Sequence, residues 1–225
     1  MKFKAIYFDR DNTITRKNNK IAEWQKQQIE SWSGQTYCMD YEKTMKLFDL
    51  AGYPKKGLKS VEEEIEFWNR YYVQLLLNEG ISEEVEEKGR RLFENIWLKD
   101  RELFPEVLEV FSFFKNNGYK IGIISDTSPS LSLTLEAVGL KEYIDCYICS
   151  DLVGVMKPDR RIYQAALDAL GARAEEAIYV DDYDIEADGA RSMGFTAFHI
   201  KREGELQSEW EISSLKDIIS YVNKY

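Results

Sequence analysis

The sequence feature that most constrains the fold is a short apolar run, Ala5–Phe8, followed at once by two carboxylates, Asp9 and Asp11. Four consecutive apolar residues are typical of a strand that is buried on both faces of a parallel sheet. Carboxylates two positions apart disfavour each other's ionisation unless a cation or buried donors offset their repulsion. Ligands of open parallel α/β sheets bind just outside the carboxyl ends of the strands. The stretch therefore predicts a functional site at the end of the first strand.

The second half of the chain alternates between apolar runs and amphipathic helical segments. Strands are predicted over 119–124, 144–149, 177–180 and 195–200, and helices over 105–114, 128–138 and 159–170, with a shorter helix ending at Met193. The helix that begins near 128 is expected to use Ser128 as its N-cap and Pro129 as its first residue. Alternation of this kind predicts an α/β fold with a doubly wound parallel sheet. The tail, 203–225, is expected to cover one edge with a helix near 215–222.

Residues 17–99 differ from this pattern because they show little strand signal and much helical periodicity. The segment Ser60-Val61-Glu62-Glu63 has the form of a capping box before a helix. Four of the five tryptophans lie in this part of the chain, which is enough to build a small core of its own. We therefore predict a helical domain over 17–99, inserted into an α/β domain made of 1–16 and 100–225.

Polar side chains follow four of the predicted strands or the loops after them. Three carboxylates at one focus require a cation, and carboxylate oxygens without nearby His or Cys favour Mg²⁺ over zinc. A carboxylate beside Mg²⁺ and a lysine suits phosphoryl transfer, where positioning and charge neutralisation supply most of the catalysis. The residues expected at this edge are Asp9, Asp11, Thr13, Ser125, Asp126, Lys157, Asp181, Asp182 and Glu186.

The order of these motifs resembles the haloacid dehalogenase (HAD) superfamily. Asp-x-Asp-x-Thr at 9–13 is followed by Ser125, then by Lys157-Pro158, and then by Asp181-Asp182 before a short helix. Within that superfamily the chain is most similar to the Mg²⁺-dependent phosphatases that carry a helical, C1-type cap directly after the first motif. The resemblance implies a Rossmann-like core with an inserted cap, and a phosphatase that hydrolyses a small phosphorylated metabolite.

The resemblance also implies roles for individual residues. Asp9 would be the nucleophile that forms an aspartyl-phosphate, and Asp11 would be the general acid and base. Mg²⁺ would be held by Asp9, Asp181 and the backbone carbonyl of Asp11, with Asp182 or Glu186 in support. The residues expected to contact or orient the phosphoryl group are Arg10, Thr13, Ser125, Asp126 and Lys157.

The chain departs from the family pattern at two positions. Asn12 stands where these phosphatases usually have glycine, but asparagine tolerates the left-handed backbone better than most residues. Glu186 replaces a more common Asp or Asn, which leaves open how metal binding is divided among Asp181, Asp182 and Glu186.

Composition limits the partners and the compartment. A net charge of −10 over 225 residues argues against binding to nucleic acid or to an anionic membrane. No apolar run approaches the roughly 18 residues that span a bilayer, and the N-terminus enters a strand at once, so we predict a cytoplasmic protein. Cys146 and Cys149 are interpreted as small hydrophobic residues on a strand, and His199 as structural.

Four alternatives to a phosphatase remain open. A phosphomutase would use the same motifs, and a 2-haloacid dehalogenase would share the fold but has no use for Asp11. A phosphoryl-accepting receiver protein would not carry a helical insertion of this size. A catalytically silent scaffold would be expected to lack some of the motifs, and here the set is complete.

Overall fold

The computed structural model describes residues 2–224, and its centre is a sheet of six parallel strands in the order β5-β4-β1-β6-β7-β8. The first strand occupies the middle of the sheet because its four residues are buried on both faces. The strands are β1 (Ala5–Phe8), β4 (Lys120–Ser125), β5 (Cys146–Cys149), β6 (Ala177–Asp181), β7 (Thr196–Ile200) and β8 (Glu211–Ile212).

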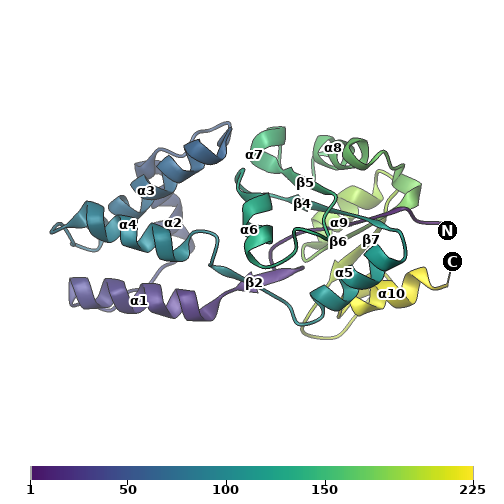
Figure 1. Ribbon diagram of the computed structural model, residues 1–225, viewed down its shortest axis with the longest axis horizontal. Helices are drawn as coiled ribbons and strands as arrows, with labels where there is room; N and C mark the ends of the chain where they lie inside the picture. Colours follow the sequence, from purple (N-terminus) through teal and green to yellow (C-terminus); the bar gives the residue numbers. More distant parts are fainter. Residues whose placement is uncertain (1, 225) are drawn as a thin grey trace.

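Helices cover both faces of this sheet, as Figure 1 shows. Side chains of β1 alternate between the two cores: Ile6 and Phe8 pack on one side, and Ala5 and Tyr7 pack on the other. The first core is completed by α5 (Val107–Asn116), α6 (Leu131–Ala137) and α10 (Lys216–Val222), and the second by α8 (Arg160–Leu170) and α9 (Asp184–Arg191). The one-turn helix α7 (Ser150–Val153) follows β5, and a 3₁₀ turn (Ala174–Glu176) precedes β6.

Four helices between the first and second strands of the sheet form a separate group, which lies to one side of the sheet in Figure 1. They are α1 (Asn19–Ser33), α2 (Tyr41–Ala51), α3 (Val61–Asn78) and α4 (Val85–Ile96). We call α1–α4 the inserted helices. Their buried apolar side chains form a third core of their own. A short antiparallel pair, β2 (Thr15–Lys17) with β3 (Arg101–Leu103), connects this group to the sheet.

The predicted α/β fold with a helical insertion is confirmed, while several local expectations differ. Ser60 caps α3 by accepting a hydrogen bond from the Glu63 N–H, as the capping-box pattern predicts. Helix α6, however, begins at Leu131 after Ser130, so the prediction of a start at Ser128 is wrong. The sequence also did not indicate β2, β3 or β8, which are only two or three residues long.

The two cysteines of β5 agree with their sequence-based interpretation. Cys146 and Cys149 are free and buried, and they pack into the cores on opposite faces of the sheet. Within residues 2–224, no helix combines the length and the apolar character that crossing a bilayer requires.

Candidate active site

The candidate active site lies at the carboxyl ends of three neighbouring strands. Strand β1 is paired in parallel with β4 on one side and with β6 on the other, so their ends meet at one edge of the sheet. Asp9 follows β1, Ser125 ends β4 and Asp181 ends β6. A cavity of about 240 Å³ opens at this edge, and Asp9, Ser125 and Lys157 are among the residues that line it.

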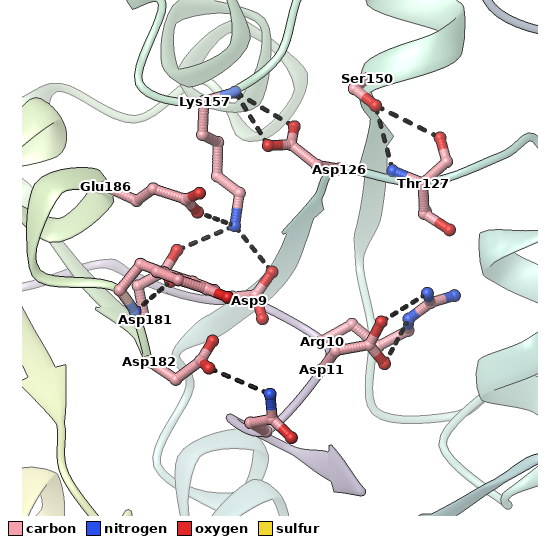
Figure 2. A network of polar contacts seen from close by, with 12 residues as sticks. Asp9, Arg10, Asp11, Asp126, Thr127, Ser150, Lys157, Asp181, Asp182 and Glu186 are labelled. Atoms are coloured by element: carbon pink, nitrogen blue, oxygen red, sulfur yellow. Dashed lines mark hydrogen bonds and ion pairs between the residues drawn. The ribbon is translucent and has the colours of Figure 1, made fainter. Parts of the chain in front are cut away.

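Lys157 is the centre of the polar network drawn in Figure 2. Its Nζ atom lies 2.7 Å from Asp9 Oδ1, 2.8 Å from Asp181 Oδ2 and 2.6 Å from Glu186 Oε2. Burial by itself would lower the pKa of this lysine, but the three carboxylates outweigh burial and raise its pKa well above the usual value. Lys157 is therefore held as a cation inside a cluster of acids.

The pKa values of two acids in this cluster are raised as well, which for a carboxyl group favours the neutral form. Burial raises the pKa of Asp9 well above its usual value, against the opposing charge of Lys157. Burial likewise raises the pKa of Glu186 to about 7, with a further contribution from Asp181. Burial in this site therefore disfavours the charged forms of Asp9 and Glu186.

Three of the carboxylates can share one metal ion. Asp9, Asp181 and Asp182 each offer an oxygen, and these oxygens all lie within 4.8 Å of one another. Asp182 is oriented by the Asn12 Nδ2 group, 3.1 Å from its Oδ2, and its carbonyl oxygen lies 3.0 Å from His199 Nε2. A set of carboxylate oxygens is the donor chemistry that hard divalent cations prefer. Glu186 is not among these three carboxylates, and its Oε2 atom contacts Lys157, as Asp9 and Asp181 also do.

Asp11 lines the same cavity but belongs to a second cluster, formed with two arginines. Its carboxylate accepts hydrogen bonds from Arg10 Nη2 at 2.8 Å and from Arg101 Nε at 2.7 Å. Thr15 Oγ1 lies 3.3 Å from Asp11 Oδ1. Burial would raise the pKa of Asp11, but the two guanidinium groups outweigh it and lower that pKa far below its usual range. In this arrangement Asp11 is ionised and turned toward the arginines.

The remaining predicted site residues are placed differently from one another. Arg10 pairs with Asp11 and lines a second cavity. This cavity lies between α3 and the sheet domain, by which we mean the six-stranded sheet with the helices that cover it. Asp126 lines the first cavity, and its carboxylate accepts the Lys157 backbone N–H at 3.1 Å, so it orients the lysine loop. Thr13 is fully buried, its hydroxyl has no hydrogen-bond partner among residues 2–224, and it is not among the residues that line the cavity.

Backbone geometry supports this arrangement at two points. Asn12 has a φ of +55°, which confirms the left-handed turn expected between the first two carboxylates and β2. Gly189 of α9 lies very close to the loop that carries Lys157. A Cβ atom at this position would be 2.6 Å from the Pro158 Cβ. Any larger residue would push α9 away from the lysine loop.

Sequence reasoning missed two residues that shape the site. Arg101 reaches Asp11 because β3 pairs with β2 in a register that sets Arg101 opposite Lys17. The Tyr179 hydroxyl donates a hydrogen bond to Asp181 from two positions earlier on β6. An arginine at the end of a long helical insertion carries no local signal. Tyr179 could have been suspected, since residues i and i+2 of a strand share one face.

Comparison with known proteins identifies the family. The haloacid dehalogenase-like hydrolase family matches residues 3–194, and the chain belongs to this family of hydrolases.

Individual relatives divide between two chemistries. The (S)-2-haloacid dehalogenase of Pseudomonas sp. (strain YL) is 33% identical over 52% of this chain and 53% of that protein, so this alignment covers about half of the relative's length. The pyrimidine 5′-nucleotidase YjjG of Escherichia coli (strain K12) is 24% identical over 100% of both chains. The crystal structure of an HAD phosphatase from Thermococcus onnurineus shares the fold, with a TM-score of 0.66 and 23% identity over 98% of each chain.

Proposed function

We propose that this protein is a Mg²⁺-dependent phosphatase that hydrolyses a small phosphate monoester through an aspartyl-phosphate on Asp9. The observation that carries the proposal is the contact of Asp9 with Lys157, at 2.7 Å, inside the cavity. The same cavity is lined by Asp182, one of the three carboxylates that could share a metal ion. Asp9, Asp181 and Asp182 would hold Mg²⁺, which supplies positive charge to the phosphoryl oxygens.

The residues of this chain account for each bond change. An oxygen of Asp9 forms a bond to phosphorus while the bond to the leaving oxygen breaks, and the leaving oxygen takes a proton from Asp11. In the second step water attacks the phosphorus, Asp11 takes the proton of that water, and the bond between phosphorus and Asp9 breaks to release inorganic phosphate. Ser125 and Lys157 line the cavity where they would bind the phosphoryl oxygens.

The proposed role of Asp11 requires its side chain to turn. Its carboxylate accepts hydrogen bonds from Arg10 and Arg101 in the present arrangement. To protonate the leaving oxygen, Asp11 has to exchange these guanidinium groups for the substrate and take up a proton from solvent, because the arginines hold it in the ionised form. Arg101 therefore lies where it would control the availability of the general acid.

The inserted helices fit the role of a cap, and we propose residues 17–99 as the cap domain. A cavity of about 130 Å³ lies between α3 and the sheet domain, and its lining includes Trp68 and Tyr72 from α3 together with Arg10 and Ser128. A leaving group of a few carbon atoms would fill it, which supports a small substrate and exclusion of water by the cap.

The test is hydrolysis of para-nitrophenyl phosphate by the purified full-length protein. We expect turnover in the presence of Mg²⁺, and loss of turnover both on chelation by EDTA and in the Asp9→Asn variant. Recovery of activity when Mg²⁺ is restored separates metal removal from denaturation. Turnover that survives Asp9→Asn would reject Asp9 as the nucleophile.

A 2-haloacid dehalogenase is the second candidate, because a relative with that activity aligns at 33% identity. A dehalogenase needs a carboxylate nucleophile but neither a general acid at Asp11 nor a cluster of metal-binding carboxylates. Chloride release from (S)-2-chloropropionate, measured beside phosphate release from the aryl ester, distinguishes the two activities. Chloride release without phosphate release would establish the dehalogenase.

A further inference from the structure

Two buried carboxylates join the inserted helices to the sheet domain. Glu64, on α3, is 3% exposed, and Asp151, on α7, is 9% exposed. Each of them is bound by donors that belong to the other part of the molecule. A buried carboxylate without hydrogen-bond donors is strongly unfavourable. Since these donors lie in the other part of the molecule, each carboxylate is both buried and hydrogen-bonded to them only while the two parts are docked.

Glu64 is bound chiefly by one residue of the sheet domain, Ser130. The Ser130 backbone N–H donates to Glu64 Oε2 at 2.7 Å, and the Ser130 hydroxyl donates to Glu64 Oε1 at 2.7 Å. Trp68, one turn further along α3, donates its indole N–H to Oε1 at 3.2 Å. Both oxygens of the carboxylate are therefore satisfied, and Ser130 is the N-cap residue that immediately precedes α6.

Asp151 is bound in the same way by the loop between α2 and α3. Its Oδ2 atom accepts hydrogen bonds from the Tyr53 hydroxyl at 2.6 Å and from the Leu58 N–H at 3.0 Å, and Lys59 Nζ donates to its carbonyl oxygen. Gly57 allows this approach, because a Cβ atom there would lie 2.4 Å from Asp151 Oδ1. The loop thus closes directly over the carboxylate.

Both contacts act on one loop of the proposed active site, residues 125–130. Ser130, at the end of this loop, is the partner of Glu64. In the middle of the loop, the Thr127 N–H donates to Ser150 Oγ at 3.0 Å, and Ser150 immediately precedes Asp151 (Figure 2). The loop begins with Ser125, which lines the catalytic cavity.

We propose that Glu64 and Asp151 are positioning residues that couple docking of the inserted helices to the placement of Ser125 and Asp126. Neither carboxylate lines the cavity that contains Asp9 and Lys157. Glu64 does line the smaller cavity beside α3, so its effect on the 125–130 loop is measured by hydrogen exchange in that loop as well as by activity. When the inserted helices undock, the 125–130 loop loses its hydrogen bonds to Glu64. The hydrogen bonds donated to Asp151 are lost as well, so the segment that binds Thr127 is held less firmly. The cap would then arrange the phosphoryl-binding loop as it closes, besides covering it. The catalytic part of this inference rests on the proposed function.

The test compares Glu64→Ala with the matched control Glu66→Ala, a neighbouring glutamate of α3 with an exposed side chain. Hydrogen–deuterium exchange of the resting protein is expected to become about tenfold to hundredfold faster at the Ser130 amide in Glu64→Ala, and to stay unchanged in the control. Glu64→Gln, which retains one acceptor for the Ser130 N–H, should fall between the two. It also provides the result if Glu64→Ala does not fold.

A kinetic measurement addresses the effect on catalysis. With para-nitrophenyl phosphate, Glu64→Ala is expected to lower kcat by at least about tenfold and to weaken inhibition by inorganic phosphate, because the loop that carries Ser125 is displaced. Glu64→Gln should restore part of both, and Glu66→Ala should match the wild type.

The possible outcomes separate the two proposals. Unchanged exchange at residues 125–130 in both Glu64 variants would overturn the coupling, whatever the activity. Faster exchange in the Glu64 variants, together with a wild-type protein that has no phosphatase activity, would support the coupling and reject the proposed function. Faster exchange with unchanged kcat in an active enzyme would overturn the positioning role.

Discussion

Replacing Lys157 by methionine should destabilise the fold strongly, because it removes a cation that contacts three acids. The ammonium group lies 2.6 to 2.8 Å from three carboxylates, and its side chain is 2% exposed. One such pair of unit charges corresponds to about 6 kcal/mol at an effective dielectric constant of about 20. Much of that attraction offsets the cost of burying the charges, and removing one partner of a buried ion pair typically costs about 3–5 kcal/mol.

We therefore expect Lys157→Met to lower the free energy of unfolding by about 3–5 kcal/mol in Mg²⁺-free buffer at pH 7.5. Methionine has a similar length, so the loss of charge is separated from the loss of packing. Urea denaturation followed by circular dichroism measures the difference, with Lys26→Met, an exposed lysine of α1, as the control. A loss below about 1 kcal/mol would refute the reasoning, because it would mean that the acids lose their charge at little cost when the lysine is absent.

Two further predictions concern groups away from the active site. Hydrogen bonds from Arg173 and Lys4 lower the pKa of Glu176 from 4.5 to about 2. The stability that this carboxylate contributes is present above pH 4.5 and is lost as the pH falls toward 2, so Glu176→Gln should flatten the acid-induced loss of stability over that window in thermal melts. Iodoacetamide at pH 8 should label the native protein once, at the exposed Cys38, because both cysteines of β5 are buried and burial raises the pKa of their thiols. Rapid labelling of either β5 cysteine would show that the strand opens.

Local patterns predicted the sheet and most of its helices. Each buried strand from β1 to β7 of the parallel sheet is a short apolar run bounded by polar or glycine residues, and this signal lies within the run itself. The start of α6 could not be read in this way. Ser128-Pro129 is a good local N-terminus, but Glu64 of α3 holds the Ser130 N–H, so the helix begins after Ser130.

The residues of the site could be predicted wherever they lie at the end of a predicted strand or in the loop after it. The meeting of Asp9, Lys157 and Asp181 follows from parallel strands whose carboxyl ends share one edge. The directions of Arg10 and Asp126 do not follow from that rule, because each is set by a particular hydrogen-bonded partner. Arg10 is turned toward Asp11, and Asp126 accepts the backbone N–H of Lys157.

By itself the sequence determined the α/β class, the helical insertion and the sheet edge at which Asp9, Lys157 and Asp181 meet, since strand and helix periodicity and the order of motifs are properties of neighbouring residues. Only the tertiary structure decided that Asp11 is held by Arg101, and that Glu64 and Asp151 bind the inserted helices to the 125–130 loop. These contacts join residues far apart in the chain. Their energies depend on burial and on the approach of oppositely charged or hydrogen-bonding atoms within about 3 Å, which local sequence patterns do not encode.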